Sequence, residues 1–266
     1  MSIDRKAFQD SFTLNTIPSW ICPTCNKGVL ETSESQIKIT ESSESKSFHS
    51  HPEWDPNCIY GGFVGSLKCS NSSCSELVGI IGKMTVFAGQ EYNEDFGAWE
   101  SVSYKILTPT QFYPPINLFL INKDVPEKVR KMIIQAFSLF WLDLSSCGNK
   151  IRTVTESIMD NKQIPKTYIN NKRKKLIYTL HQRIEKFRKT NSEIADLLMS
   201  IKWIGNIGSH QIENLTKNDI LDGFEILELV TNKLYETDSV RIKKISKKIN
   251  KSRRPIGHLT KTKRGR

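Results

Sequence analysis

The stretch Cys22-Pro23-Thr24-Cys25 and its counterpart Cys69-Ser70-Asn71-Ser72-Ser73-Cys74 decide how the N-terminal part of this chain folds. Each pair of cysteines sits in a short polar turn. Gly28 follows the first pair, where glycine lets the backbone amides fold back toward the sulfurs. Two such turns supply the number of thiolates that a closed tetrahedral structural zinc site requires. We therefore expect one structural Zn²⁺ per chain, bound by Cys22, Cys25, Cys69 and Cys74.

Disulfides and a chance spacing are the alternative interpretations of these cysteines. The residues 1–10 are charged and no apolar stretch follows them, which is unlike a secretory signal peptide and predicts a cytoplasmic location. Disulfides are rare in a reducing cytosol, which favours the metal. His49, His51 and Cys58 lie between the two pairs and could replace one ligand. Cys147 is remote from the pairs and is predicted to be a small buried hydrophobe.

Strand-like segments surround the cysteine pairs. Apolar and β-branched residues mark 36–40, 59–67, 77–87 and 102–107, and polar or glycine-containing turns separate them. We predict a zinc-ribbon-like β module over residues 1–110, with a long insertion between its two cysteine turns. The proline-containing segment 111–125 is predicted to be an extended linker.

From Pro126 the apolar residues recur at helical spacing. A first helix is predicted to stop at Cys147-Gly148-Asn149, and 161–175 is predicted to be a loop. Further helices are predicted over 150–160, over 176–188, from Asn191 to a break at the glycines 205–208, and from a capping box at 216–219. The predicted fold class is α+β: the β module, an all-α helical bundle over 126–238, and a basic tail over 239–266.

Positive charge is concentrated at the C-terminus. The formal net charge is +11, yet residues 241–266 hold 12 Lys or Arg and no Asp or Glu, so the rest of the chain sums to −1. The longest apolar runs are too short to span a bilayer. We expect the tail to bind an RNA or DNA backbone, with an anionic membrane surface as the alternative.

A second basic run, 170–175, is predicted to open a helix, although such runs also occur as solvated faces. The candidate nucleic-acid-binding residues of the two regions are Lys172, Arg173, Lys174, Lys175, Lys243, Lys244, Lys247, Lys248, Arg253 and Arg254.

A family resemblance rests on three motifs. The segment Ser200-Ile-Lys-Trp-Ile-Gly-Asn-Ile-Gly-Ser-His210 resembles the Gly-Asn…His signature of the bacterial family known as domain of unknown function 4145, part of the HEPN-like superfamily of helical bundles. Arg152 and Glu156 are similar to the Arg…Glu helix of such domains, and 20–25 is similar to the zinc knuckle that often precedes the bundle. The resemblance covers most of 20–236 and implies a HEPN-like bundle behind a zinc ribbon.

The resemblance also implies a chemistry to test. Nuclease members of the superfamily cleave RNA without metal through an Arg-x4-6-His motif, in which His moves or positions a proton and Arg stabilises phosphorane charge. Here the required arginine positions before His210 hold other residues, and the nearest cation is Lys202, a poorer phosphate clamp. Arg152 could supply the guanidinium from another helix. The candidate catalytic residues are His210, Asn206, Arg152, Glu156 and Lys202.

Two functions remain open from the sequence. The first is a nucleic-acid-engaging binding or adaptor module of a prokaryotic defence, restriction or toxin-type system, a setting implied by the resemblance. The alternative is a metal-independent ribonuclease that uses His210 with Arg152 or Lys202. In the architectural interpretation Asn206 and His210 cap a helix break, and Arg152 pairs with Glu156. A homodimer or a partner protein of the same system is expected in either case.

Overall fold

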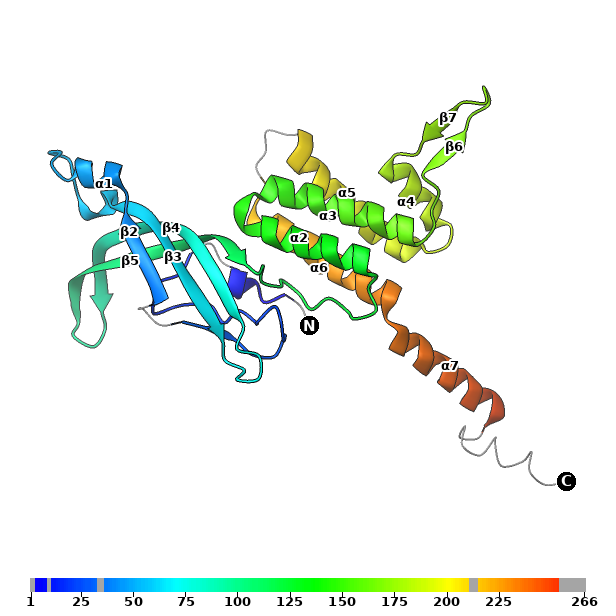
Figure 1. Ribbon diagram of the computed structural model, residues 1–266, viewed down its shortest axis with the longest axis horizontal. Helices are drawn as coiled ribbons and strands as arrows, with labels where there is room; N and C mark the ends of the chain where they lie inside the picture. Colours follow the sequence, from blue (N-terminus) through cyan, green and yellow to red (C-terminus); the bar gives the residue numbers. More distant parts are fainter. Residues whose placement is uncertain (1–2, 9–10, 33–35, 211–214, 254–266) are drawn as a thin grey trace.

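The structure is a computed structural model that describes residues 3–8, 11–32, 36–210 and 215–253. Its chain forms a curled antiparallel sheet beside a group of helices, which is a mixed α+β fold (Figure 1). None of the helices in these ranges combines the length and the apolar character that crossing a membrane demands.

The sheet occupies the N-terminal half and is longer than its sequence pattern predicts. Its order is β1-β3-β4-β5, and β2 pairs with the same edge of β3 as β1. The predicted strands 77–87 and 102–107 continue past these limits and pair along their whole length into one long hairpin. The strands are β1 (Leu30–Glu31), β2 (Ile37–Glu41), β3 (Tyr60–Cys69), β4 (Leu77–Asn93) and β5 (Ala98–Tyr113).

The insertion between β2 and β3 is helical and supports the long hairpin. It contains α1 (Ser43–Phe48) and a 3-10 turn, η3 (Pro56–Cys58). Asn57 of η3 forms two hydrogen bonds with the backbone of Ala88 in β4: its Nδ2 donates to the carbonyl at 3.1 Å and its Oδ1 accepts from the amide at 2.9 Å. The insertion therefore pairs with β4 just beyond the last residue that β3 reaches, Thr85.

The C-terminal half is helical, with one further hairpin between α3 and α4. A short 3-10 helix, η1 (Arg5–Phe8), lies at the N-terminus of the chain. The remaining elements are α2 (Glu127–Leu142), α3 (Leu144–Asn161), β6 (Thr167–Ile169), β7 (Lys175–Ile177), α4 (Leu180–Arg188), α5 (Ser192–His210), α6 (Lys217–Tyr235) and α7 (Thr237–Ser252).

Two predicted helix ends were wrong. The first helix stops at Asp143, whose backbone ends α2 and whose side chain accepts a hydrogen bond from the amide of Ser145 to begin α3. Gly148 lies inside α3, and α5 continues through Gly205 and Gly208 to His210, where a break was predicted. Gly148 and Gly205 lie inside their helices, at a helix–helix contact described below.

Two other segments also differ from their predicted structure. The predicted loop 161–175 contains β6 and the start of β7, so the basic run 170–175 forms the turn of a hairpin and does not open a helix. The predicted linker 111–125 is partly sheet and then packs into the core, where Ile116, Leu118 and Phe119 are buried. The capping box at 216–219 is confirmed, since Thr216 and Asp219 exchange hydrogen bonds at the start of α6.

One core joins the two halves. Trp141 of α2 lies 4.8 Å from Phe112 at the end of β5 and 6.1 Å from Trp20, measured between ring centroids. Phe119 of the predicted linker lies 5.2 Å from Phe137 of α2. Burial of large aromatic rings dominates the energetics of such a core. The halves are therefore packed against each other through aromatic side chains.

Candidate metal centre and basic surfaces

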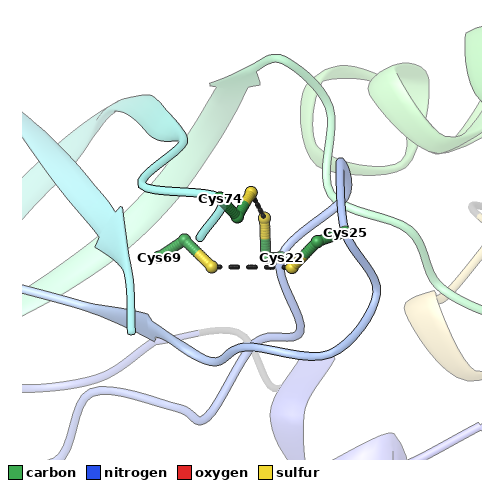
Figure 2. A group of neighbouring side chains, drawn as sticks. All are labelled: Cys22, Cys25, Cys69 and Cys74. Atoms are coloured by element: carbon green, nitrogen blue, oxygen red, sulfur yellow. Dashed lines mark hydrogen bonds between the residues drawn. The ribbon is translucent and has the colours of Figure 1, made fainter. Parts of the chain in front are cut away.

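Four cysteines converge at one end of the sheet (Figure 2). The Sγ atoms of Cys22, Cys25, Cys69 and Cys74 all lie within 4.8 Å of one another. The distance from Cys22 to Cys74 is 3.9 Å and that from Cys25 to Cys69 is 3.6 Å, both between Sγ atoms. None of the four forms a disulfide. The predicted set is thus brought together, and it could hold a metal ion.

The first cysteine turn is shaped by backbone hydrogen bonds. The amide of Cys22 donates to the carbonyl of Gly28 at 2.8 Å, and the amide of Gly28 approaches the Sγ of Cys25 at 3.4 Å. Hydrogen bonds from the backbone amides of Gly28 and Lys27 lower the pKa of Cys25, which favours the thiolate that binds metal. A Cβ on Gly28 would lie 2.5 Å from the Sγ of Cys69, so only glycine fits there.

Short strand pairing brings the second cysteine turn to the first. Leu30 of β1 is in register with Cys69 at the end of β3, and the amide of Ser70 donates to the carbonyl of Val29 at 2.9 Å. Across the turn, the amide of Cys69 donates to the carbonyl of Glu76 at 2.9 Å. The two ends of the segment between the cysteine pairs are therefore held side by side by β1 and β3. This pairing places both cysteine pairs at one site.

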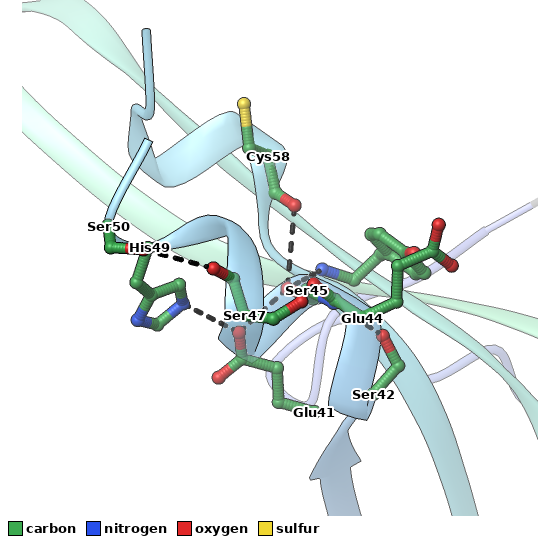
Figure 3. A network of polar contacts seen from close by, with 9 residues as sticks. Glu41, Ser42, Glu44, Ser45, Ser47, His49, Ser50 and Cys58 are labelled. Atoms are coloured by element: carbon green, nitrogen blue, oxygen red, sulfur yellow. Dashed lines mark hydrogen bonds and ion pairs between the residues drawn. The ribbon is translucent and has the colours of Figure 1, made fainter. Parts of the chain in front are cut away.

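The alternative ligands lie elsewhere. Nε2 of His49 donates a hydrogen bond to the carboxylate of Glu41 at 2.7 Å, and the ring of His51 stacks on Phe48 with ring centroids 4.5 Å apart. Figure 3 shows His49 and Cys58 around the buried Ser45, whose hydroxyl donates to Glu41 at 2.7 Å. These side chains belong to the packing of the insertion. Cys147 is fully buried, as predicted, and burial raises the pKa of its thiol.

The helices α3 and α5 bring together several of the predicted catalytic residues. A Cβ on Gly205 would lie 2.7 Å from the Cβ of Arg152 and 2.8 Å from the carbonyl oxygen of Gly148, so the two backbones meet at this point. Arg152 pairs with Glu156 at 3.8 Å, and its Nε is buried without a hydrogen-bond partner among the described residues. Burial and then the positive charge of Arg152 lower the pKa of Lys202.

The positions of the remaining two candidates follow from helical spacing. Asn206 is half-buried and follows Gly205 in α5. His210 is the last residue of α5, one helical turn beyond Asn206, and its side chain lies outside the described residues. Lys202, Asn206 and His210 therefore share one face of α5 by spacing.

A groove of about 370 Å³ adjoins Arg152 and contains residues that sequence reasoning missed. One side of the groove is the face of α3 that carries Arg152, Glu156 and Asp160. The other side is formed by Tyr178, which precedes α4, and by Arg183 of α4. Asp160 binds Lys166 at 2.7 Å and the buried Arg183 at 2.8 Å. The spacing of 152, 156 and 160 on one helix face was a signal that could have identified Asp160.

The pKa of Asp160 reflects this pairing. Burial acts to raise it, but the hydrogen bonds from Lys166 and Arg183 hold the pKa below its ordinary value. Asp160 is therefore an anion that fixes two cations at the base of the β6–β7 hairpin.

Two elements of the helical half present the predicted basic residues. At the β6–β7 turn, Oδ1 of Asn170 accepts hydrogen bonds from the amides of Lys172 and Lys174, and Arg173 adopts φ 56°. Lys172, Arg173, Lys174 and Lys175 are exposed. α7 carries Lys243, Lys244, Lys247 and Lys248, and Arg253 follows it; Arg254 lies outside the described residues, as does the side chain of Lys243.

Comparison with known proteins gives two family matches. No curated protein and no solved structure matches the chain. Residues 10–112 match the family model described as Domain of unknown function (DUF8608), which covers the sheet and its cysteines. Residues 134–252 match the family model described as Domain of unknown function (DUF4145), and this match supports the DUF4145 family for the helical half of the chain.

Proposed function

We propose that this protein binds RNA or DNA through the basic elements of its helical half, as a binding or adaptor module of a prokaryotic defence, restriction or toxin-type system. The observation that supports nucleic-acid binding is the location of the positive charge. The β6–β7 hairpin and α7 both project from the other helices (Figure 1). No Asp or Glu occurs in 161–178 or after residue 238. A projecting cation-rich element attracts phosphates without reading sequence.

The hairpin adds stacking surfaces to this charge. Tyr168 and Tyr178 stack with ring centroids 4.5 Å apart, and the Nζ of Lys186 lies 4.5 Å above the ring of Tyr178. Single-stranded nucleic acid is held by such combinations of aromatic rings and cations. Among the described residues, no carboxylate lies within ion-pairing distance of Lys172, Arg173 or Lys174, so these charges are available to phosphates.

The proposal assigns Zn²⁺ to the four cysteines. A tetrahedral zinc ion with bonds of about 2.3 Å to sulfur separates the sulfurs by about 3.8 Å. The separations of 3.9 and 3.6 Å support this fit. Four protein ligands leave no open position, so the ion would tie the two cysteine turns together and do no chemistry. The finer fold assignments, a zinc ribbon and a HEPN-like bundle, belong to the same proposal.

Deletion of residues 241–266 tests the binding function. We expect the affinity for single-stranded RNA and duplex DNA at low salt to fall about a hundredfold or more, with a shallower salt dependence, because fewer counterions are released. Fluorescence anisotropy at several KCl concentrations measures both. A full-length variant with glutamine at Lys244, Lys247, Lys248 and Lys251 separates charge from length. Unchanged affinity and salt slope in both variants would refute the proposal.

A metal-independent ribonuclease is the second candidate, and one observation favours it. The aliphatic stem of Arg152 lies against Gly205, five residues before His210 in α5, and the charge of Arg152 contributes to the lowered pKa of Lys202. A bidentate cation beside a histidine suits phosphoryl transfer within RNA.

Substitution distinguishes this chemistry from a packing role. If the site cleaves RNA, His210→Ala and Arg152→Ala abolish cleavage with little change in Tm, and cleavage by the wild-type protein persists in chelator. If the residues only support the helices, wild type cleaves no RNA and both substitutions lower Tm.

A further inference from the structure

The outer end of the β4–β5 hairpin, residues 90–101, carries an exposed aromatic group. Tyr92 and Trp99 face each other in register with ring centroids 5.7 Å apart, and Phe96 occupies the turn. Trp99 is 67% exposed and Phe96 is 75% exposed. Large aromatic side chains gathered on a surface in this way mark an interaction site. We call residues 90–101 the acidic tip because they also carry four carboxylates.

The charges around these rings exclude a phosphate backbone as the ligand. The acidic tip contains Glu91, Glu94, Asp95 and Glu100 and no Lys or Arg. Carboxylates repel phosphates and attract cationic surfaces, so the aromatic rings here do not suit base stacking. They suit a partner that offers apolar side chains flanked by lysines.

The backbone of this region is also without lateral support. β3 pairs with β4 only up to Thr85, and the next supports are the hydrogen bond from the amide of Val86 to the carbonyl of Ile59 and the contact of Asn57 with Ala88. From there to the turn, β4 and β5 pair only with each other, up to Asn93 and Ala98. A two-stranded hairpin is marginally stable in water unless a third element packs against it.

The chain itself contains a surface of the required kind. Ile242, Ile245 and Ile249 recur at helical spacing on α7, and Ile242 is 59% exposed. Lys244, Lys247, Lys248 and Lys251 flank this stripe. An apolar stripe with lysines on both sides is complementary, in charge and in polarity, to the acidic tip. We call residues 241–252 the basic face.

We propose that the acidic tip binds the basic face of a second copy of this chain. Within one chain the two surfaces lie at opposite ends of the long axis, so they do not meet (Figure 1). Two copies arranged antiparallel about a two-fold axis would bring each acidic tip to the partner's basic face, and both contacts would form at once. The result is a closed dimer, in which the partner's acidic tip occupies the α7 lysines that would otherwise bind nucleic acid.

Charge exchange tests this dimer in the full chain without nucleic acid. Glu94→Lys with Asp95→Lys changes the turn, where neither side chain forms a hydrogen bond or ion pair among the described residues. Lys247→Glu with Lys248→Glu changes the basic face. Sedimentation analysis should show that each pair raises the dimer dissociation constant about tenfold or more, and that the combined quadruple variant recovers the wild-type value. Glu53→Lys, an exposed carboxylate of the same half, should leave it unchanged.

Two further measurements locate the contact. Phe96→Ser should weaken the dimer, whereas Leu142→Ser, which is similarly exposed on α2, should not. Zero-length carboxyl–amine crosslinking of mixed isotope-labelled chains should join the peptide containing 91–100 to that containing 244–251 between chains. A wild-type monomer at all concentrations, a quadruple variant that fails to recover, or crosslinks only within one chain would each overturn the proposal.

Discussion

The two β-hairpins of this molecule have similar surfaces and opposite charge. The acidic tip carries Tyr92 and Trp99 with four carboxylates, whereas the β6–β7 hairpin carries Tyr168 and Tyr178 with lysines and an arginine. Aromatic residues on a hairpin therefore do not identify a ligand by themselves. The charge beside the rings decides whether a phosphate or a cationic protein surface is attracted.

The hairpins also differ in how they are anchored. The β4–β5 hairpin extends from the sheet, three residues after Cys74 of the metal centre. The β6–β7 hairpin is fixed by the ion pairs of Asp160 with Lys166 and Arg183. One anchor is a cluster of four thiols that could hold a metal ion, and the other is a buried ion pair, so the two can be disrupted separately.

The largest expected effect is on the first anchor. Cys22→Ser or Cys74→Ser should release the metal and unfold the cysteine end of the sheet, because structural zinc supplies on the order of 10 kcal/mol of folding free energy. Helical circular dichroism should be retained. Elemental analysis and thermal unfolding measure this, and Cys58→Ser, a thiol of the same half outside the cluster, should bind metal normally. Wild-type protein without zinc would contradict the assignment.

The next effect concerns the second anchor. Asp160→Asn should lower the free energy of unfolding by about 3 kcal/mol, because Arg183 keeps its charge while its side chain is only 6% exposed. Asp196→Asn, which removes an exposed partner of Arg188, should cost much less. Denaturant unfolding measures both. Equal losses would show that the buried pair is not an anchor.

The same pair predicts a pH dependence. The folded pKa of Asp160 is held below its ordinary value, so its contribution is complete above the unfolded pKa of about 3.9. It is lost as the pH falls through the lower, folded pKa. The stability difference between wild type and Asp160→Asn should therefore shrink below about pH 4.

A smaller effect compares the charges of the two hairpins. Glutamine at Lys172, Arg173 and Lys174 should weaken binding of single-stranded RNA about tenfold and reduce the salt slope by up to about 2, since each phosphate contact on a single strand contributes about 0.7. Glu94→Lys with Asp95→Lys on the acidic tip should not weaken it. If anisotropy titrations showed a larger loss of RNA affinity in the acidic-tip variant than in the β6–β7 variant, the acidic tip would be the hairpin that binds RNA.

The smallest effect concerns the rings. Tyr178→Ala should cost about 1 kcal/mol of binding to single-stranded RNA through lost stacking, and less to duplex DNA, whose bases are already stacked. Tyr92→Ala on the acidic tip serves as the matched control and should leave RNA affinity unchanged. An equal loss in both variants would mean that rings alone, without regard to charge, contact the nucleic acid.

The sequence predicts the local features of the fold well and the long-range ones poorly. The four cysteines and the cap at Thr216 could be found because spacing within a few residues specifies them. The β6–β7 hairpin was missed because each strand has three residues and is largely exposed, with Ile177 79% exposed, so no alternation of buried and exposed positions marks it. The segment 111–125 was predicted to be a linker because Pro114 and Pro115 are visible in the sequence and the aromatic partners of Phe119 on α2 are not.

The candidate site was predicted in part for a similar reason. Helical spacing correctly paired Arg152 with Glu156. It did not reveal that Gly205 brings Arg152 to α5, because that contact joins residues on different helices. The burial of Arg183 against Asp160 was not predicted, because it depends on where the β6–β7 hairpin returns to the helices.

The contact between Gly205 and Gly148 has a consequence for the sequence signature that contains it. Because a Cβ at 205 would meet backbone at 2.8 Å, the glycine of Gly-Asn-x3-His sets the separation of α3 and α5. In this chain any larger residue at position 205 would push α3 and α5 apart, whatever the residue at the histidine position does. The signature is a measure of geometry first, and chains that share it need not share a reaction.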